Sequence, residues 1–221
     1  MNLKTWIVSA CFLFLVHYAG IAQNTPQESL DSSRALVSGN YVNGKKDGVW
    51  DYFSAGKILL ARHFYKDGVK INIWEFYDGD GSLSWTYDFN NGQANYLKAN
   101  TAGGYYAYQG PGGQWVKSEP DKKTIWLNSE AQWQNFQELN LRYPESAVKQ
   151  RVQGKVSVKV TVDENGNPIA YAIQESLNPK LDAVALSVVK AYGPEFVPAE
   201  KMGAKVKSIY IIKVNFRIQQ G

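Results

Sequence analysis

Residues 154–175, GKVSVKVTVDENGNPIAYAIQE, decide the fold of the carboxy-terminal part of this chain. Valine stands at every second position from Val156 to Val162, which is the period of a strand with one buried face. The turn sequence DENGN at residues 163–167 follows, and its Asn and Gly residues tolerate a positive φ. Pro168 can begin a second strand because no ladder donor is needed there. The stretch therefore predicts a β-hairpin.

A helix and a last strand are expected after this hairpin. Asn178 is a good N-cap, and Pro179 suits the first turn of a helix. Apolar residues then recur at helical spacing as far as Tyr192, and Pro194 prevents continuation. The final run, residues 206–218, is rich in β-branched and aromatic residues, which favour a strand.

Two shorter helices are expected before the hairpin. Residues 145–150 follow Tyr143 and Pro144, and Gly154 ends this helical run. Residues 129–139 place Trp133 and Phe136 one turn apart, which is typical of a helix with one apolar face. The order of the carboxy-terminal third, from residue 143 onward, is therefore helix, hairpin, helix, strand.

The same elements carry an ordered set of short motifs at characteristic spacings. These are Tyr143-Pro144 with Ala147, Gly154-Lys155-Val156, the turn at residues 163–166, Leu181-Asp182 with Ala185, Val197-Pro198-Ala199 before Gly203, and Val214-Asn215-Phe216. Together, over residues 139–218, they resemble the C-terminal domain of TonB, the periplasmic protein that passes inner-membrane energy to outer-membrane receptors. Many relatives carry a Trp ahead of the Val-Pro-Ala segment, whereas this chain has Phe196 there.

The resemblance implies a mechanism of strand addition. The extended amino-terminal segment of an outer-membrane receptor, the TonB box, would pair with the exposed edge of the last strand. Five basic residues and no acid lie between Lys201 and Arg217, and they either keep this edge soluble or also attract an acidic peptide. The expected partner-binding residues are Val206, Ser208, Ile209, Tyr210, Ile211, Ile212, Lys213, Val214, Asn215, Phe216 and Tyr143.

The amino terminus has the pattern of a targeting segment. Residues 1–22 combine a positive Lys4, an apolar core and small residues before Gln23, which favours a cleaved secretory signal. The alternative is an uncleaved anchor, since the apolar stretch is near the lower length limit for a membrane span. A chain that kept the anchor would have inner-membrane motor proteins as further partners. Self-association is a further expectation.

Composition and residue usage argue against an enzyme. The formal net charge of +4 is too mild to indicate a nucleic-acid partner. Removal of residues 1–22 removes the only cysteine and leaves His63 as the only histidine, so no Cys/His metal site or thiol nucleophile is expected. His63 itself is interpreted as a half-exposed strand residue. We expect no catalytic residue, no metal and no cofactor.

Residues 39–97 repeat with a step of 24. Gly44, Gly68 and Gly92 keep this step, as do Trp50 and Trp74. A fixed period above 20 indicates stacked supersecondary units, here pairs of strands. The pattern resembles the bacterial MORN-like repeat of the YwqK type, with the second glycine of one unit replaced by Asn72. The fold class expected for the whole chain is α+β, with an antiparallel β-repeat region before the TonB-like domain.

The aromatic residues of the repeats have two interpretations. In the first they are packing rungs of a small sheet, because aromatic rings bury much apolar area for few residues. In the second they form an exposed platform that binds a cell-wall glycan or a protein, with nearby acids such as Asp51 and Glu75. The candidate residues for such a surface are Trp50, Tyr52, Trp74 and Tyr77.

The predicted organisation is a targeting segment over residues 1–22, a repeat region over 39–97, a linker or capping segment over 98–128 and a TonB-like domain over 129–221. The linker lacks the Pro/Lys-rich spacer with which TonB crosses the periplasm. The function that follows is non-catalytic binding of a transport receptor in the cell envelope, with or without energy transduction. The alternative is a periplasmic scaffold or glycan-binding repeat protein that uses the TonB-like domain only for docking.

Overall fold

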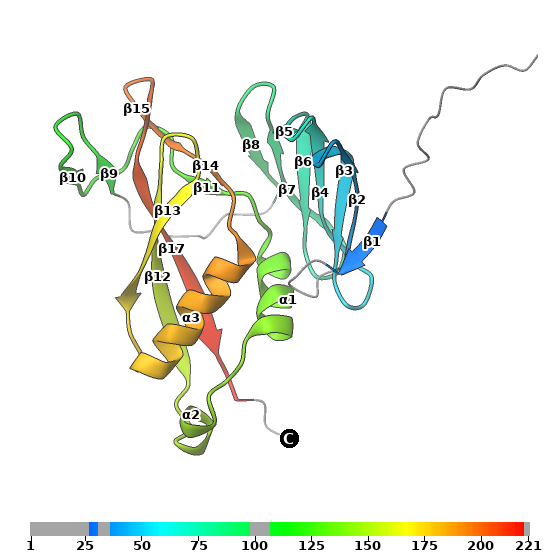
Figure 1. Cartoon of the computed structure of the whole chain (residues 1–221). Helices are drawn as coiled ribbons and strands as arrows, with labels where there is room; N and C mark the ends of the chain where they lie inside the picture. Colours follow the sequence, from blue (N-terminus) through cyan, green and yellow to red (C-terminus); the bar gives the residue numbers. More distant parts are fainter. Residues whose placement is uncertain (1–26, 31–35, 98–106, 219–221) are drawn as a thin grey trace, which may run out of the picture.

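The computed structural model describes residues 27–30, 36–97 and 107–218. The expected targeting segment, residues 1–22, lies outside this part of the chain. No helix within the described ranges is long and apolar enough to cross a membrane. The architecture is α+β, with two larger antiparallel sheets, two two-stranded ribbons and three helices among the described residues (Figure 1).

The first sheet is a meander in which neighbours in sequence pair in space. Its order is β1-β2-β3-β4-β6-β7-β8, and β5 pairs with β4. The strands are β1 (Gln27–Leu30), β2 (Leu36–Val42), β3 (Lys45–Phe53), β4 (Leu59–Lys66), β5 (Val69–Lys70), β6 (Ile73–Tyr77), β7 (Leu83–Asp88) and β8 (Gln93–Tyr96). Alternation in β3, β4, β6 and β7 directs aromatic side chains to one buried face, which includes Trp50, Tyr65, Trp74, Phe76 and Trp85.

The step of 24 residues reappears in the contacts of this sheet. The indole of Trp50 donates to the carbonyl of Asn40 at 3.2 Å, and the indole of Trp74 donates to the carbonyl of Phe64 at 3.0 Å. Asn72 stands where the other unit has Gly48, and both take a left-handed backbone, with φ of 57° and 76°. Asn can replace Gly there because its short polar side chain tolerates that region.

The second sheet holds the hairpin of residues 154–175 together with the last strand. Its order is β10-β9-β17-β12-β13, in which β12 lies between β17 and β13 (Figure 1). The strands are β9 (Tyr108–Gln109), β10 (Trp115–Val116), β12 (Gly154–Val162), β13 (Pro168–Glu175) and β17 (Ser208–Phe216). Two small ribbons pair β11 (Ile125–Trp126) with β14 (Phe196–Val197), and β15 (Ala199–Lys201) with β16 (Ala204–Val206).

The helices confirm the expected order of the carboxy-terminal part. They are α1 (Glu130–Asn140), α2 (Glu145–Lys149) and α3 (Pro179–Tyr192). The side chain of Asn178 caps α3 by accepting from two backbone N–H groups, and Gly193 ends that helix in the left-handed region. The valines of β12 are fully buried against Leu181, Val189 and the other apolar residues of the α3 stripe.

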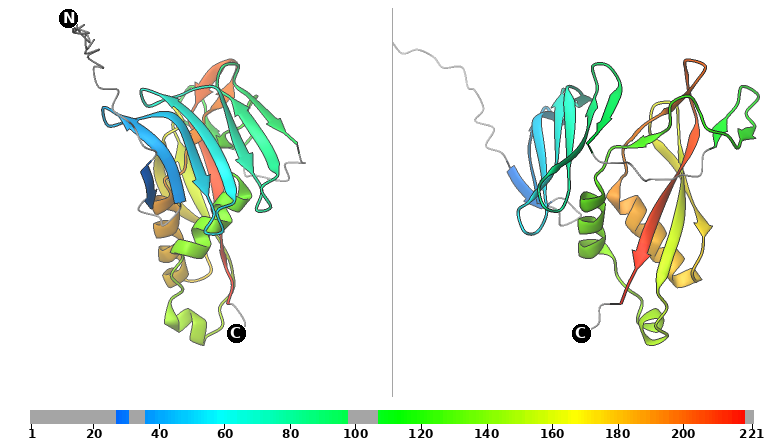
Figure 2. Two further views of the ribbon diagram at one scale, coloured as in Figure 1. Left: turned by 90° about the vertical axis from the view of Figure 1, so that its right-hand side faces the viewer. Right: turned by 180° about the vertical axis from the view of Figure 1, so that it is seen from behind.

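Helix α1 lies between the two sheets, as the view from behind in Figure 2 shows. Its N-cap, Ser129, donates its hydroxyl to the carbonyl of Leu60 in β4. The preceding residues also join the two parts, because Leu127 packs into the core of the meander and Asn128 accepts from the indole of Trp85 at 3.2 Å. An ion pair of 2.7 Å between Lys70 and Glu195 crosses the same junction.

His63 is buried, so its interpretation as a half-exposed strand residue is wrong. Its side chain is only 4% exposed, because the inner face of the meander is covered by the rest of the protein. The imidazole stacks on the Trp74 ring with 3.8 Å between centroids. Burial, followed by the charges of Lys46 and Lys70, holds its pKa well below the ordinary value.

Replacing Gly39 with Ala should destabilise the meander. A Cβ at this position would lie 2.3 Å from the Trp50 ring, so the buried indole must move. We expect a loss of about 1–3 kcal/mol in the free energy of unfolding, measured by urea denaturation. Gly56→Ala is the control, since the nearest atom to its added Cβ is 3.6 Å away. Equal midpoints for the two variants would contradict the packing of Trp50 against Gly39.

Acidification should destabilise the fold through His63. In the unfolded chain this imidazole binds a proton near pH 6.5, whereas in the folded chain it stays neutral to a lower pH. The unfolded state therefore binds more protons than the folded state below about pH 6.5. The free energy of unfolding decreases there as the pH is lowered, by at most about 1.4 kcal/mol per pH unit. His63→Phe should lose less stability between pH 7.5 and 5.5 in urea denaturation. If both proteins lose the same amount, His63 is not held neutral.

Candidate functional site at the flank of β17

The last strand is paired along its whole length on one side only. It runs antiparallel to β12, with register partners from Gly154 and Phe216 at one end to Val162 and Ser208 at the other. The flank of β17 that faces away from β12 is the edge on which the resemblance placed the partner peptide. A peptide can pair with this flank only where neighbouring segments do not already form hydrogen bonds with its backbone groups.

Every second residue of β17 directs its backbone groups to this flank. The N–H of Ile209 donates to the carbonyl of Ala107 at 3.0 Å, and the carbonyl of Lys207 accepts from Gln109 at 2.7 Å. Backbone groups alternate in an antiparallel strand, so Ile211, Lys213 and Asn215 point to the same side as Ile209. Strand β9 thus covers only the beginning of the flank, where Ser208 is opposite Tyr108.

Helix α1 covers the far end of the flank with side chains. The indole of Trp133 donates to the carbonyl of Lys213 at 3.0 Å, and the side-chain carbonyl of Gln137 accepts from the N–H of Asn215 at 3.0 Å. Both α1 residues are buried. These two contacts supply the hydrogen bonds that a neighbouring strand would otherwise make at this end.

A short stretch between these covers remains for pairing. In the described ranges, the carbonyl of Ile209, both backbone groups of Ile211 and the N–H of Lys213 have no hydrogen-bond partner. We call these four groups the Ile211 window. The window is narrower than the expected edge over residues 206–216. Val206 lies outside it because it belongs to β16, which pairs with β15.

The side chains of β17 divide between two faces as the alternation predicts. Ser208, Ile212, Val214 and Phe216 are buried, and Tyr210 is half-buried against the same core. Ile209, Ile211 and Asn215 are half-buried on the opposite face, and Lys213 is exposed there. The window is therefore bordered by two isoleucine side chains and one lysine.

Tyr143 lies at the carboxy-terminal end of β17 and supports the core there. Its ring meets the buried Phe216 ring edge-on, with 5.6 Å between centroids. Its hydroxyl donates to the carbonyl of Val152. These contacts fix the end of the strand, and they do not place Tyr143 at the Ile211 window.

The basic residues near β17 are held differently from one another. Lys201 forms an ion pair of 2.6 Å with Asp121, and this hydrogen bond raises the pKa of Lys201 and lowers that of Asp121. Lys213 and Arg217 are exposed beside the flank. They are the charges of this group best placed to meet an approaching peptide.

The second interpretation of the repeats, an exposed aromatic platform, is wrong for Trp50 and Trp74. Trp50 is 4% exposed and Trp74 is fully buried, because their face of the meander packs against the rest of the protein. They are packing rungs, as the first interpretation of the repeats held. Tyr52 and Tyr77 are half-buried.

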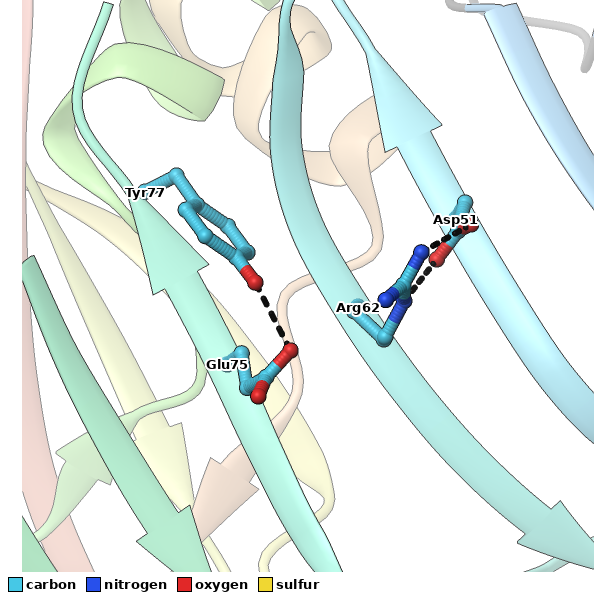
Figure 3. Close-up of polar contacts among 4 residues, drawn as sticks. All are labelled: Asp51, Arg62, Glu75 and Tyr77. Carbon is cyan, nitrogen blue, oxygen red and sulfur yellow. Dashed lines mark hydrogen bonds and ion pairs between the residues drawn. The ribbon is translucent and has the colours of Figure 1, made fainter. Parts of the chain in front are cut away.

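The acids of the outer face of the meander are engaged by neighbours in the sheet. Arg62 binds Asp51 with two hydrogen bonds of 2.7 and 2.9 Å, and the hydroxyl of Tyr77 donates to Glu75 at 2.7 Å (Figure 3). Burial and then the Glu75 carboxylate raise the pKa of Tyr77 to about 12. The Arg62–Asp51 pair joins β4 to β3, and cross-strand pairs of this kind stabilise a sheet, whereas Tyr77 and Glu75 lie on the same strand, β6.

The sequence did not indicate the parts of the site that come from α1. The pattern of residues 129–139 predicts a helix with Trp133 on its apolar face, and Gln137 is simply a residue within that range. Their contacts join residues 80 and 78 positions apart, and local pattern carries no signal for them.

Comparison with known families identifies the part of the chain that holds the window. Residues 140–218 match the family described as Gram-negative bacterial TonB protein C-terminal. No curated protein and no solved structure matches the chain. The matched range contains β12, β13, α3 and β17, whereas the meander and Trp133 and Gln137 of α1 precede it. Residues 140–218 are therefore a domain of the TonB C-terminal family.

Proposed function

We propose that this protein binds the amino-terminal segment of an outer-membrane transport receptor, without catalysis, by adding it as a strand at the Ile211 window. The observation that supports the proposal is a set of backbone groups on β17 that no other described residue pairs with, inside the range that matches the TonB C-terminal family. An extended peptide that lies antiparallel or parallel to β17 can complete these groups. The protein then acts in the cell envelope, where proteins of this family are found.

Backbone pairing alone does not hold such a peptide. The four groups of the window allow four hydrogen bonds, each worth about 1 kcal/mol net. Ordering a peptide of about five residues costs about 1–2 kcal/mol for each residue. The remaining free energy must come from side chains, and Ile209 and Ile211 offer apolar surface beside the window. The complex is therefore weak, with a Kd on the order of micromolar.

The charges beside the flank favour an acidic peptide. Lys213 and Arg217 are exposed on β17 and just after it. Long-range attraction by such residues raises the rate of association more than the final affinity. Coupling of this complex to inner-membrane motor proteins is proposed only for a chain that keeps residues 1–22 as an anchor.

Ile211→Pro tests the window directly. Proline removes an N–H that points away from β12, so the ladder with β12 keeps its hydrogen bonds while the incoming strand loses a donor. In the full chain, we expect receptor amino-terminal peptides to shift the amide signals of residues 208–216 in the parent protein. In Ile211→Pro these shifts should vanish or require about tenfold more peptide.

The control is Ile169→Pro on β13, which forms the opposite edge of the second sheet. This variant should bind the peptides as the parent does. Circular dichroism checks that both variants remain folded. Undiminished binding by Ile211→Pro, or a loss confined to Ile169→Pro, would place the peptide elsewhere and reject the proposal.

Charge reversal at Lys213 should weaken binding of an acidic peptide. We expect Lys213→Glu to raise the Kd about fivefold at low salt, with the difference shrinking as salt screens the charges. Lys45→Glu in the meander makes the same change of net charge at an exposed site and should leave the Kd unchanged. Titration calorimetry at two ionic strengths measures both. Equal effects of the two variants would show that only net charge matters.

A further inference from the structure

A second candidate site lies where the inner face of the meander meets α1 and the end of α3. A cavity of about 270 Å³ opens there between the two parts of the protein. Ala191 and Gly193, at the end of α3, are exposed at this cavity, so it reaches the surface. Its lining includes Lys46, His63, Gln132, Phe136, Tyr192 and Glu195.

Two lining residues present buried polar atoms with no partner. Both ring nitrogens of His63 and the side-chain carbonyl oxygen of Gln132 are buried, and no hydrogen bond reaches them within the described residues. Buried polar groups are nearly always paired with protein or an ordered ligand or water. The His63 ring is fixed by stacking on Trp74 on the meander, so it cannot easily turn to another partner.

The charges around the cavity cancel. Lys46 and Glu195 are the two charged lining residues, one of each sign. Glu195 forms an ion pair of 2.7 Å with Lys70, and Lys46 donates to the hydroxyl of Tyr52 at 3.0 Å. An ionic ligand would therefore find no excess of opposite charge, which favours a neutral one.

We propose that this cavity binds a small, uncharged molecule rich in hydroxyl groups, of the size of a single sugar ring. A hydroxyl group both donates and accepts, and a neutral imidazole offers one donor and one acceptor while the Gln132 carbonyl accepts. Phe53, Phe136 and Tyr192 supply apolar and aromatic walls for the C–H face of such a ring. The volume is at the lower end for small-molecule sites, as a ligand of this size requires.

The inference is independent of peptide binding at β17. His63 and Gln132 precede residues 140–218, so the cavity depends on the meander and α1 as well as on the family domain. It also differs from the aromatic platform expected from the repeats, because Trp50 and Trp74 do not line it. Loss of either site by mutation would leave the other measurable.

NMR of the isotope-labelled full chain tests the proposal. The hydroxyl-rich probes are methyl glucoside, N-acetylglucosamine and inositol, and acetate and inorganic phosphate are the ionic probes. We expect at least one hydroxyl-rich probe to shift the ring nitrogens of His63 and the side-chain amide of Gln132 at millimolar concentration. The ionic probes should leave these signals in place.

Variants on α1 locate the binding. Gln132→Ala removes a lining carbonyl and should raise the Kd of the bound probe about tenfold. Gln134→Ala is the matched control, because its side chain is exposed and donates to Glu130. His63→Phe keeps an aromatic ring beside Trp74 but removes both nitrogens, and the probe should then no longer shift the side-chain amide of Gln132.

Three outcomes would overturn the inference. No shift of His63 with any hydroxyl-rich probe would show that the cavity holds water only. Stronger binding of acetate or phosphate would show that an anion is its ligand. Equal affinity of the parent and Gln132→Ala for the probe would show that it binds elsewhere.

Discussion

The antiparallel pairing of β17 with β12 is the constraint on which the proposed function depends. It satisfies the backbone groups of alternate residues and, by the same geometry, directs those of Ile209, Ile211, Lys213 and Asn215 away from β12. The buried face of β17 fixes this register, because a slip by one residue would turn Ile212, Val214 and Phe216 out of the core. The identity of the groups offered to a partner thus follows from core packing.

Helix α1 connects this edge with the rest of the protein. On one side, Trp133 and Gln137 supply hydrogen bonds to β17. On another, Gln132 faces the cavity beside the meander. Its N-cap residue Ser129 also contacts β4. A single helix of three turns therefore contributes side chains to the peptide-binding edge, to the cavity and to the junction of the two sheets.

Local pattern was sufficient for the elements but not for their surroundings. The valine alternation of β12, the Asn178 cap and the apolar stripe of α3 predicted the hairpin and helix, since these depend on neighbours in sequence. Whether Trp50 and Trp74 face solvent could not be decided in the same way. The sequence of a strand with an aromatic face is the same whether or not another part of the protein packs on that face. His63 was misjudged for this reason. The hydrogen bonds of α1 to β17 join residues about 80 positions apart, and no short-range pattern encodes them.

The length of the Ile211 window is set by residues that precede the family domain. Ala107 and Gln109 end it on one side, and Trp133 and Gln137 end it on the other. All four lie before residue 140, where the match to the TonB C-terminal family begins. The contacts at the Trp133 end use two buried side chains, whereas those at the Ala107 end use paired backbone. A partner peptide longer than the window would therefore have to displace buried side chains at the α1 end or separate paired backbone at the β9 end, and two hydrogen bonds close each end.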